Sequence, residues 1–409
     1  MLRSKRAQCL VTIAAGLSAA GAHAWAVDAS DVLVYSIGSI RLKPHLAVSE
    51  QYDDNIFFRP GKPVAGFPSV PVESDFVTVV SPGMNLQLGS KEANHITLDY
   101  TMDESFYVNQ TSQDHRDHSF FLNTHLEGSR IKLDGNDRVQ FLSGILGGTL
   151  NLGQRVDRKS FLDDYRLTYP FTEKTSAYVD GVFEATDYKQ GTSLYDENTI
   201  RGTGGVGFRI APKVTLFGEV RYGQAATSPN IRGLADAPHA DLYGGYAGAS
   251  GDFNSRLTGS IKVGYEILEF SNGAPGSSSP VVELSLTQKF GERTVASLIY
   301  SRRNSISVQL ASSAFTADTV SVQLSHVITT DGKLQAILTG SLENGQYENS
   351  GAFASRRDLL YHAGFALNYN LQLWLRAGLL YDYEKFDSNS NLVFDYADNR
   401  VSLRISVGY

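Results

Sequence analysis

The feature that most constrains this chain is a two-residue alternation of apolar and polar side chains, which recurs from about Leu42 to Tyr409. Successive side chains of a β-strand point to opposite faces, so this period indicates strands with one apolar and one polar face. A soluble sandwich strand shows such a pattern once or twice, whereas here it recurs along the chain. In the last segment Arg400, Ser402, Arg404, Ser406 and Gly408 alternate with Val401, Leu403, Ile405, Val407 and Tyr409.

The connections between these segments alternate between short turns and longer loops along most of the chain. We count eight turns, the first at Gly89 to Asn94 and the last at Asn368 to Leu371, and nine longer loops between residues 53 and 392. Outer-membrane barrels have short periplasmic turns and longer extracellular loops. The sequence therefore predicts an all-β fold, a transmembrane antiparallel up-and-down β-barrel of about 18 strands with both ends on the periplasmic side.

Two places interrupt this pattern. Asp134-Gly135-Asn136 could form a hairpin turn instead of the middle of a strand, which leaves 16 strands as the alternative count. Closer to the N-terminus, the alternation slips at Ser81-Pro82-Gly83 and moves Val77 and Val79 out of phase with Met84. We interpret that slip as a β-bulge.

The first 26 residues have the features of a cleavable secretory signal peptide. A basic start is followed by an apolar stretch from Cys9 to about Ala20, and two small-residue cleavage patterns end at Ala24 and Ala26. We predict cleavage before Val27, with Trp25 as the alternative first residue. Residues 27–41 would then form a short periplasmic N-terminal segment, and residues 42–409 the outer-membrane barrel. No later stretch approaches the roughly 18 to 20 consecutive apolar residues that a membrane-spanning helix needs.

Composition limits the compartment and the partners. Cys9 is the only cysteine and lies in the signal segment, so no disulfide can stabilise the mature chain. The signal also contains three of the 36 basic residues, and the 33 that remain face 43 acidic residues, a net charge of about −10. This balance argues against a nucleic-acid partner. We expect the bacterial outer membrane instead, with outer-membrane lipid around the chain.

The alternation places charges of both signs on the face that points into the barrel. One interpretation is a lattice of ion pairs that stiffens the wall, because Arg or Lys facing the middle of the lipid costs about 2 to 4 kcal/mol. Another is that the same groups line a hydrated path, for which a barrel of 16 to 18 strands is wide enough. The inward cations are Arg166, Arg201, Arg209, Arg221, Arg256, Lys262, Arg376 and Arg404, and the inward acids are Asp99, Asp180, Glu184, Glu219, Glu266, Glu283, Glu343 and Asp382.

Aromatic residues at inward positions would suit a saccharide, because the apolar C–H faces of sugars pack against rings. Trp374 is the main candidate, and Phe121, Tyr178 and Phe217 share the inward phase. A barrel this rich in aromatic residues also places some rings inside by chance, so this pattern alone does not assign a sugar-binding role.

A catalytic or metal-binding barrel is the competing class. Asp114-His115-Arg116-Asp117-His118 falls in a predicted loop and offers acids and two imidazoles. A lone H-x-x-H pair lacks the further ligands and supporting groups of a metal site, and a solvated loop explains it equally well. We therefore predict no enzyme, no catalytic residue, no metal and no cofactor.

The N-terminal part of the predicted barrel resembles a known family, the putative β-barrel porin 2 family. The resemblance rests on Leu42-Lys43-Pro44-His45-Leu46, on Tyr52, Asp53, Asp54 and Asn55, and on Ser81-Pro82-Gly83-Met84. Members of that family often accompany exopolysaccharide gene clusters. The resemblance implies an outer-membrane barrel that serves as a conduit or wall component for secreted polysaccharide, and it brings no catalytic residues with it.

The end of the chain resembles a second pattern, the signal that the outer-membrane barrel assembly machinery recognises. That signal has an aromatic residue at the extreme C-terminus and apolar residues at alternate positions before it. The resemblance implies the assembly machinery as a partner. The residues that match are Val401, Leu403, Ile405, Val407 and Tyr409.

These observations predict a non-enzymatic outer-membrane pore, most specifically one that passes exopolysaccharide and has polysaccharide-export components as partners. A general diffusion porin for small hydrophilic solutes and a plugged structural or docking barrel are the alternatives. Passive porins often fold a long loop into the lumen, and residues 53–73 and 224–240 are the candidate loops.

Overall fold

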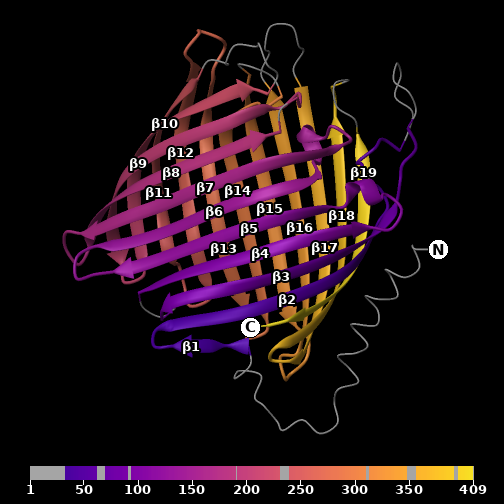
Figure 1. The fold of residues 1–409 in the computed structure, drawn as a ribbon. Helices are drawn as coiled ribbons and strands as arrows, with labels where there is room; N and C mark the ends of the chain where they lie inside the picture. Colours follow the sequence, from indigo (N-terminus) through magenta and orange to yellow (C-terminus); the bar gives the residue numbers. More distant parts are fainter. Residues whose placement is uncertain are drawn as a thin grey trace.

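The computed structural model describes residues 33–61, 70–90, 94–189, 191–230, 239–309, 313–347, 356–390 and 395–408. In these residues the chain forms a short first strand and 18 long antiparallel strands (Figure 1). The strands are β1 (Tyr35–Ile37), β2 (Ile40–Asp53), β3 (Asp75–Gly89), β4 (His95–Tyr107), β5 (His115–Glu127), β6 (Lys132–Ile145), β7 (Arg155–Pro170), β8 (Thr175–Tyr188), β9 (Tyr195–Ala211), β10 (Val214–Pro229), β11 (Ala240–Asp252), β12 (Leu257–Phe270), β13 (Ser277–Phe290), β14 (Thr294–Ile306), β15 (Ala314–Val327), β16 (Leu334–Tyr347), β17 (Arg356–Gln372), β18 (Leu375–Ser388) and β19 (Tyr396–Val407). Two single-turn 3-10 helices, η1 (Thr111–Gln113) and η2 (Gly148–Leu150), lie in loops.

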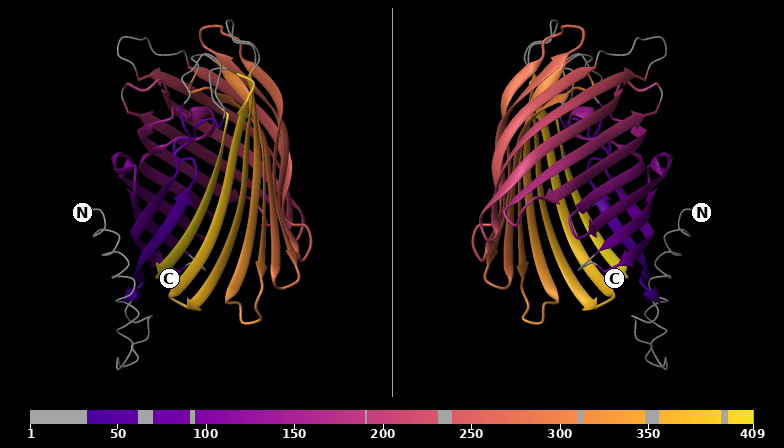
Figure 2. Two further views of the ribbon diagram at one scale, coloured as in Figure 1. Left: turned by 90° about the vertical axis from the view of Figure 1, so that its right-hand side faces the viewer. Right: turned by 90° about the vertical axis from the view of Figure 1, so that its left-hand side faces the viewer.

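The 18 long strands close into a barrel. Each pairs with its neighbour in sequence, and β19 pairs with β2 from Arg400 opposite Asp53 to Val407 opposite Leu46. The two side views show the tilted strands on opposite walls of this barrel (Figure 2). The predicted barrel of 18 strands is confirmed, and Asp134 to Asn136 lie within the continuous strand β6. Of the helices in the described part of the chain, none is long and apolar enough to cross a membrane.

The two ends of the barrel differ. We call the end with the short connections the turn end and the other the loop end. The apolar positions of the alternation point outward and are exposed on the isolated chain, as for Val220 (68% exposed) and Leu403 (63% exposed). Val401 and Ile405 are also exposed on this outer face, whereas Tyr409 lies outside the described residues. The matching polar positions face the lumen, where closely packed side chains cover many of them.

The predicted β-bulge at Ser81 to Gly83 is wrong. The pairing of β2 with β3 keeps one register from Ile40 opposite Leu88 to Asp53 opposite Asp75, and β3 keeps one register with β4 on both sides of the interruption. Pro82 has no N–H to donate, which explains a break in hydrogen bonding without a shift in register. Val77 therefore faces the lumen, where it is 4% exposed.

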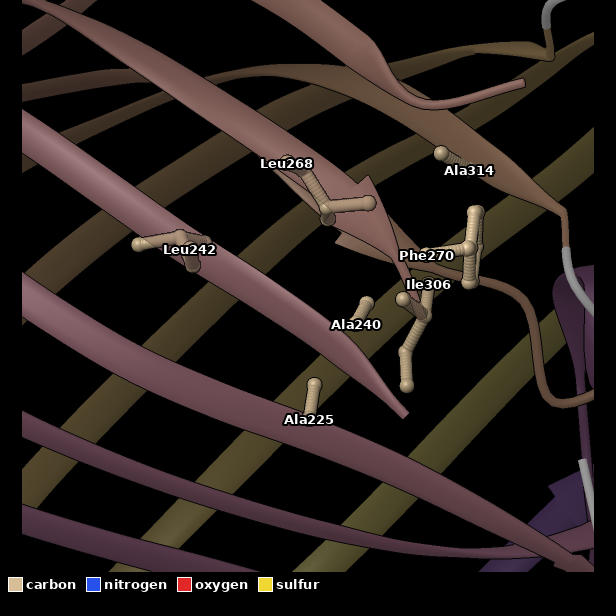
Figure 3. Close-up of a cluster of buried hydrophobic side chains, with 7 residues drawn as sticks. All are labelled: Ala225, Ala240, Leu242, Leu268, Phe270, Ile306 and Ala314. Atoms are coloured by element: carbon tan, nitrogen blue, oxygen red, sulfur yellow. The ribbon is translucent and has the colours of Figure 1, made fainter. Parts of the chain in front are cut away.

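A cluster of apolar side chains fills part of the loop end on its inner side. Leu242, Leu268 and Ala225 have the same phase along their strands as the inward polar residues below them. The close-up shows these side chains gathered with residues from β14 and β15 (Figure 3). The cluster consists of Ala225, Ala240, Leu242, Leu268, Phe270, Ile306 and Ala314.

Candidate functional site: the lumen wall and the mouth

A lattice of ion pairs covers the inner wall from β10 to β13. Lys262 Nζ lies 2.9 Å from Glu219 Oε1 and 2.6 Å from Glu283 Oε2, so one ammonium joins two strands that do not pair directly. Arg221 lies 3.3 Å from Glu266 and 3.8 Å from both Glu219 and Glu283. The side chains of Glu219 and Glu266 are only 3% exposed. Their charges are compensated by this pairing, since burial of an unpaired carboxylate is costly.

The lattice continues onto β7, β8 and β9. The Arg166 guanidinium donates two hydrogen bonds to the Asp180 carboxylate, at 2.6 and 2.7 Å. On the next pair of strands, Arg201 lies 2.8 Å from Glu184. The structure thus brings together four of the cations and five of the acids that the sequence placed in the lumen.

Two tyrosines complete the lattice by lying flat against the wall. Tyr178 donates to Glu219 Oε2 at 2.8 Å, and Tyr246 donates to Glu266. The Tyr178 ring lies over Gly205, where an added Cβ would come within 2.2 Å of the ring. Glycine is needed at this position because no larger residue leaves room for the ring. Sequence reasoning considered Tyr178 only as a sugar contact and missed its hydrogen bond, which depends on strand register.

A cavity of about 440 Å³ opens on this wall. Its lining combines paired charges with hydroxyl groups, so it suits water and a hydrated solute better than an apolar ligand. The lining includes Asp164, Arg166, Asp180, Arg201, Thr203, Arg221, Lys262, Glu266, Glu283, Ser285 and Ser301.

The other sequence-predicted charges lie apart from the lattice. On the wall formed by β17 and β18, Asp382 lies 3.3 Å from the His362 imidazole, and Arg376 donates to Asn370 Oδ1 at 2.9 Å. Arg209, Arg404 and Glu343 have the inward phase of their strands and form no ion pair with any residue in the described ranges.

Two predicted lumen residues, Trp374 and Arg256, lie outside the strands. Strand β17 continues to Gln372, so the turn before β18 consists of Leu373 and Trp374 and not of residues 368–371. The Trp374 carbonyl accepts a hydrogen bond from Gly408 N at 2.9 Å. Arg256 lies in the turn before β12. Both residues therefore belong to the turn-end rim, not to the middle of the lumen wall.

Phe121 and Phe217 keep the inward phase of their strands. The Arg138 guanidinium lies 5.6 Å from the centre of the Phe121 ring, and the Phe217 ring packs on Gly248. Each ring is thus placed by a neighbouring strand, and neither lines the cavity described above.

The loop between β6 and β7 crosses the barrel at the loop end. Gly148 N donates to the Tyr396 hydroxyl on β19, and Asn151 Nδ2 donates at 2.8 Å to the carbonyl of Phe58, which follows β2. A Cβ on Gly147 would lie 2.6 Å from a carboxylate oxygen of Glu384 on β18. Four strands separate β6 from β19 along the wall, so these contacts span the mouth.

A second loop, between β14 and β15, also reaches across the mouth. Tyr195 N at the start of β9 donates to the Val308 carbonyl at 2.8 Å. Gln309 accepts from Arg356 on β17 at 2.9 Å. The two loops together narrow the loop end of the lumen.

Sequence reasoning chose other loops for this role. Residues 62–69 and 231–238, in the centres of its candidates 53–73 and 224–240, lie outside the described residues. The loop after β6 carries a signal that could have identified it, because Leu146, Leu150 and Leu152 are apolar residues in a connection otherwise expected to be solvated. They pack with Val156 and Tyr188.

The two imidazoles of the H-x-x-H pattern are on different faces of β5. His115 belongs to the inward phase, and its Nδ1 lies 2.7 Å from the Gln113 carbonyl. His118 belongs to the outward phase, with its Nδ1 2.9 Å from the Tyr100 hydroxyl. A strand cannot direct both rings to one ion. In the described residues no group of three or more His, Cys, Asp or Glu side chains is arranged to hold a metal.

The family-like segment from Tyr52 to Asn55 closes the barrel seam between β2 and β19. The Asp54 carboxylate accepts from Asn399 N at 2.7 Å and from Asn399 Nδ2 at 2.8 Å. Asn55 Nδ2 donates to the Ala397 carbonyl at 2.9 Å, and Asp53 Oδ1 accepts from Asn55 N at 2.9 Å. These short polar side chains join the first and last long strands at the loop end.

We expect Asp54→Ala to lower the free energy of unfolding by about 2 kcal/mol, because two hydrogen bonds to a carboxylate are lost. Urea unfolding in lipid vesicles measures this change, and hydrogen exchange should quicken in β2 and β19. Asp395→Ala is the control, since that carboxylate accepts from Ser388 N within one loop. Equal exchange of the seam strands in both variants would contradict the assignment.

Comparison with known proteins agrees with this architecture. The family described as putative beta-barrel porin 2 matches residues 35–409. No curated protein matches the chain. Among solved structures, the chain is similar to OpdK of Pseudomonas aeruginosa, at 10% identity over 90% of this chain and 99% of that chain, with a TM-score of 0.47. It is also similar to OccK5 of the same organism, at 11% identity over 90% and 98% with a TM-score of 0.46.

A third similar structure is OccAB3 of Acinetobacter baumannii, at 12% identity over 90% of this chain and 99% of that chain, with a TM-score of 0.44. These likenesses are too distant to carry function, so the family match supplies the identity. Since that match extends over the whole barrel, the chain belongs to the putative beta-barrel porin 2 family and is a porin-like β-barrel of the outer membrane.

Proposed function

We propose that this barrel passes exopolysaccharide across the outer membrane. The observation that carries the proposal is the inner wall itself, where paired charges and hydroxyl groups surround a cavity of about 440 Å³. Hydrated saccharides present many hydroxyl groups, and a wall of fixed polar partners can exchange hydrogen bonds with them along a path. The resemblance to a family that accompanies exopolysaccharide gene clusters supports the same solute.

The proposal includes the route by which the chain reaches the membrane. Residues 1–26 would direct secretion and be removed, and the apolar residues Val401, Leu403, Ile405 and Val407 with Tyr409 would be read by the barrel assembly machinery. Polysaccharide-export components on the periplasmic side would deliver the polymer. No chemical step is assigned to the barrel.

Single-channel conductance of the refolded protein in a planar bilayer tests this function. We expect a steady current that an added oligosaccharide blocks in a concentration-dependent manner, because the sugar occupies the same path as the ions. A current indifferent to every oligosaccharide would indicate a diffusion porin for small solutes. No current at any voltage would indicate a plugged structural barrel, and either result overturns the proposal.

A further inference from the structure

The charges of the lumen are distributed unevenly along its axis. Six cations lie within the first or last few residues of their strands at the turn end, all with the inward phase. None of them forms an ion pair with a described residue. This turn-end ring consists of Arg41, Lys43, Arg209, Lys289, Arg376 and Arg404.

Strand register places these side chains inside. Arg41 lies opposite Gln87, which is 2% exposed, and Arg404 lies opposite Ser49. Arg209 alternates with Phe208 and Ile210, which are 51% and 54% exposed on the outer face. The ring therefore lines the lumen, not the lipid-facing surface.

Three of the acids at this level contact groups outside the ring. Asp134 lies 3.0 Å from Lys132 and 2.7 Å from the His125 imidazole, and Asp252 lies 3.1 Å from Lys213. Glu127 lies 4.0 Å from the same imidazole. A further acid, Asp99, accepts from Asn85 Nδ2 at 3.0 Å, and no described acid lies within ion-pair distance of a ring cation, so the six cations outnumber the acids around them.

The acids of the loop end are mostly buried. Asp53 and Asp75 are 9% and 1% exposed and form no ion pair with a described residue. Asp398 and Asp358 are also buried, each next to one arginine. These carboxylates are covered by protein, whereas five of the six ring cations are exposed, so a solute in the lumen meets the ring and not these acids.

We propose that the turn-end ring binds an anionic saccharide, one that carries carboxylate or other acidic substituents, as it enters the lumen. A lumen lined by one sign of charge raises the local concentration of ions of the other sign. This inference rests on the proposed function and specifies the class of polymer.

The test compares two oligosaccharides of equal length in planar bilayers, a hexamer of uronic acid and a neutral glucose hexamer, each added to one compartment and then to the other. We expect the acidic hexamer to block at about fivefold lower concentration than the neutral one, and from one side only. Each exposed charge contact contributes a factor of roughly 1.5 to 5.

Matched triple variants locate the site. Arg209→Gln with Arg376→Gln and Arg404→Gln should remove the preference for the acidic hexamer. The control is Lys159→Gln with Lys189→Gln and Lys385→Gln, which removes the same charge from the outer face near the loop end and should retain the preference. The single variant Arg404→Gln, with a smaller effect, serves if a triple variant does not refold.

The outcomes separate the two proposals. Equal block by both hexamers overturns the anionic class and leaves saccharide passage standing, whereas no block by either removes the proposed function as well. If the preference for the acidic hexamer survives in the triple ring variant, the ring is not the saccharide site. The same conclusion follows if an acidic protein binds the turn end while the acidic hexamer has no effect.

Discussion

Shortening the loop between β6 and β7 is expected to raise the single-channel conductance of this protein at least about twofold, since an empty barrel of this size encloses an aqueous channel. The change would replace residues 147–153 by a two-residue turn. Those residues cross the mouth and are fixed on the far side by Tyr396 and by the Phe58 carbonyl. Their removal takes away backbone that obstructs the path of ions.

Smaller changes should act in the same direction with less effect. Tyr396→Phe removes the hydroxyl that accepts from Gly148 N and donates to Glu384. Gly147→Ala introduces a methyl group 2.6 Å from a Glu384 oxygen, so the loop must shift. We expect both variants to give a noisier and larger current.

Tyr222→Phe is the matched control, because that hydroxyl bonds to Asp241 at 3.0 Å on the outer face. It should leave the current unchanged. Heat-dependent migration on gels confirms that each variant is folded before recording. If the shortened loop leaves conductance at the wild-type value, the constriction lies elsewhere and the crossing contacts do not limit flow.

The strand count and the facing of most side chains could be predicted because the membrane imposes them locally. A side chain that faces lipid must be apolar, whereas the next one along the strand faces the lumen and need not be. Each strand therefore shows the two-residue alternation in its own sequence. The turn positions follow from the same pattern. Only the turn near Trp374 lies appreciably away from its predicted position, since the alternation alone does not show where β17 ends.

The β-bulge predicted at Ser81 to Gly83 was wrong because this rule does not hold at every inward position. We assumed that apolar residues point outward, but Val77 points into the lumen and is covered there. A narrowed lumen provides dry positions that an open water-filled barrel would not. The buried Val77 and the loops across the mouth both show that the loop end of the lumen is partly filled by protein.

The partners within the lumen could not be predicted because they depend on tertiary contacts. Gly148 and Tyr396 are separated by 248 residues, and no local pattern relates them. Likewise, Lys262 reaches Glu219 across the intervening strand β11. Which charges meet depends on the shear of the barrel and on the tilt of its strands, quantities that a single sequence does not contain.

The ion-pair lattice should be the most sensitive part of the wall to substitution. Lys262→Met is expected to lower the free energy of unfolding by about 3 kcal/mol, because it leaves the buried Glu219 carboxylate without its cation. Arg221 remains 3.8 Å from Glu219 and compensates only in part. Urea unfolding in lipid vesicles measures the loss, and Arg404→Met, which breaks no ion pair with a described residue, should cost no more than about 0.5 kcal/mol.

A second substitution distinguishes an unpaired charge from lost packing. Glu219→Gln added to Lys262→Met removes the stranded carboxylate and retains most of the side-chain volume. We expect the double variant to recover more than half of the lost stability, because an amide can still accept the 2.8 Å hydrogen bond from Tyr178. If the double variant is as unstable as Lys262→Met alone, the lysine acts through its contact with Tyr246, whose ring centre lies 5.1 Å from Nζ, and the ion pair with Glu219 contributes little to the wall.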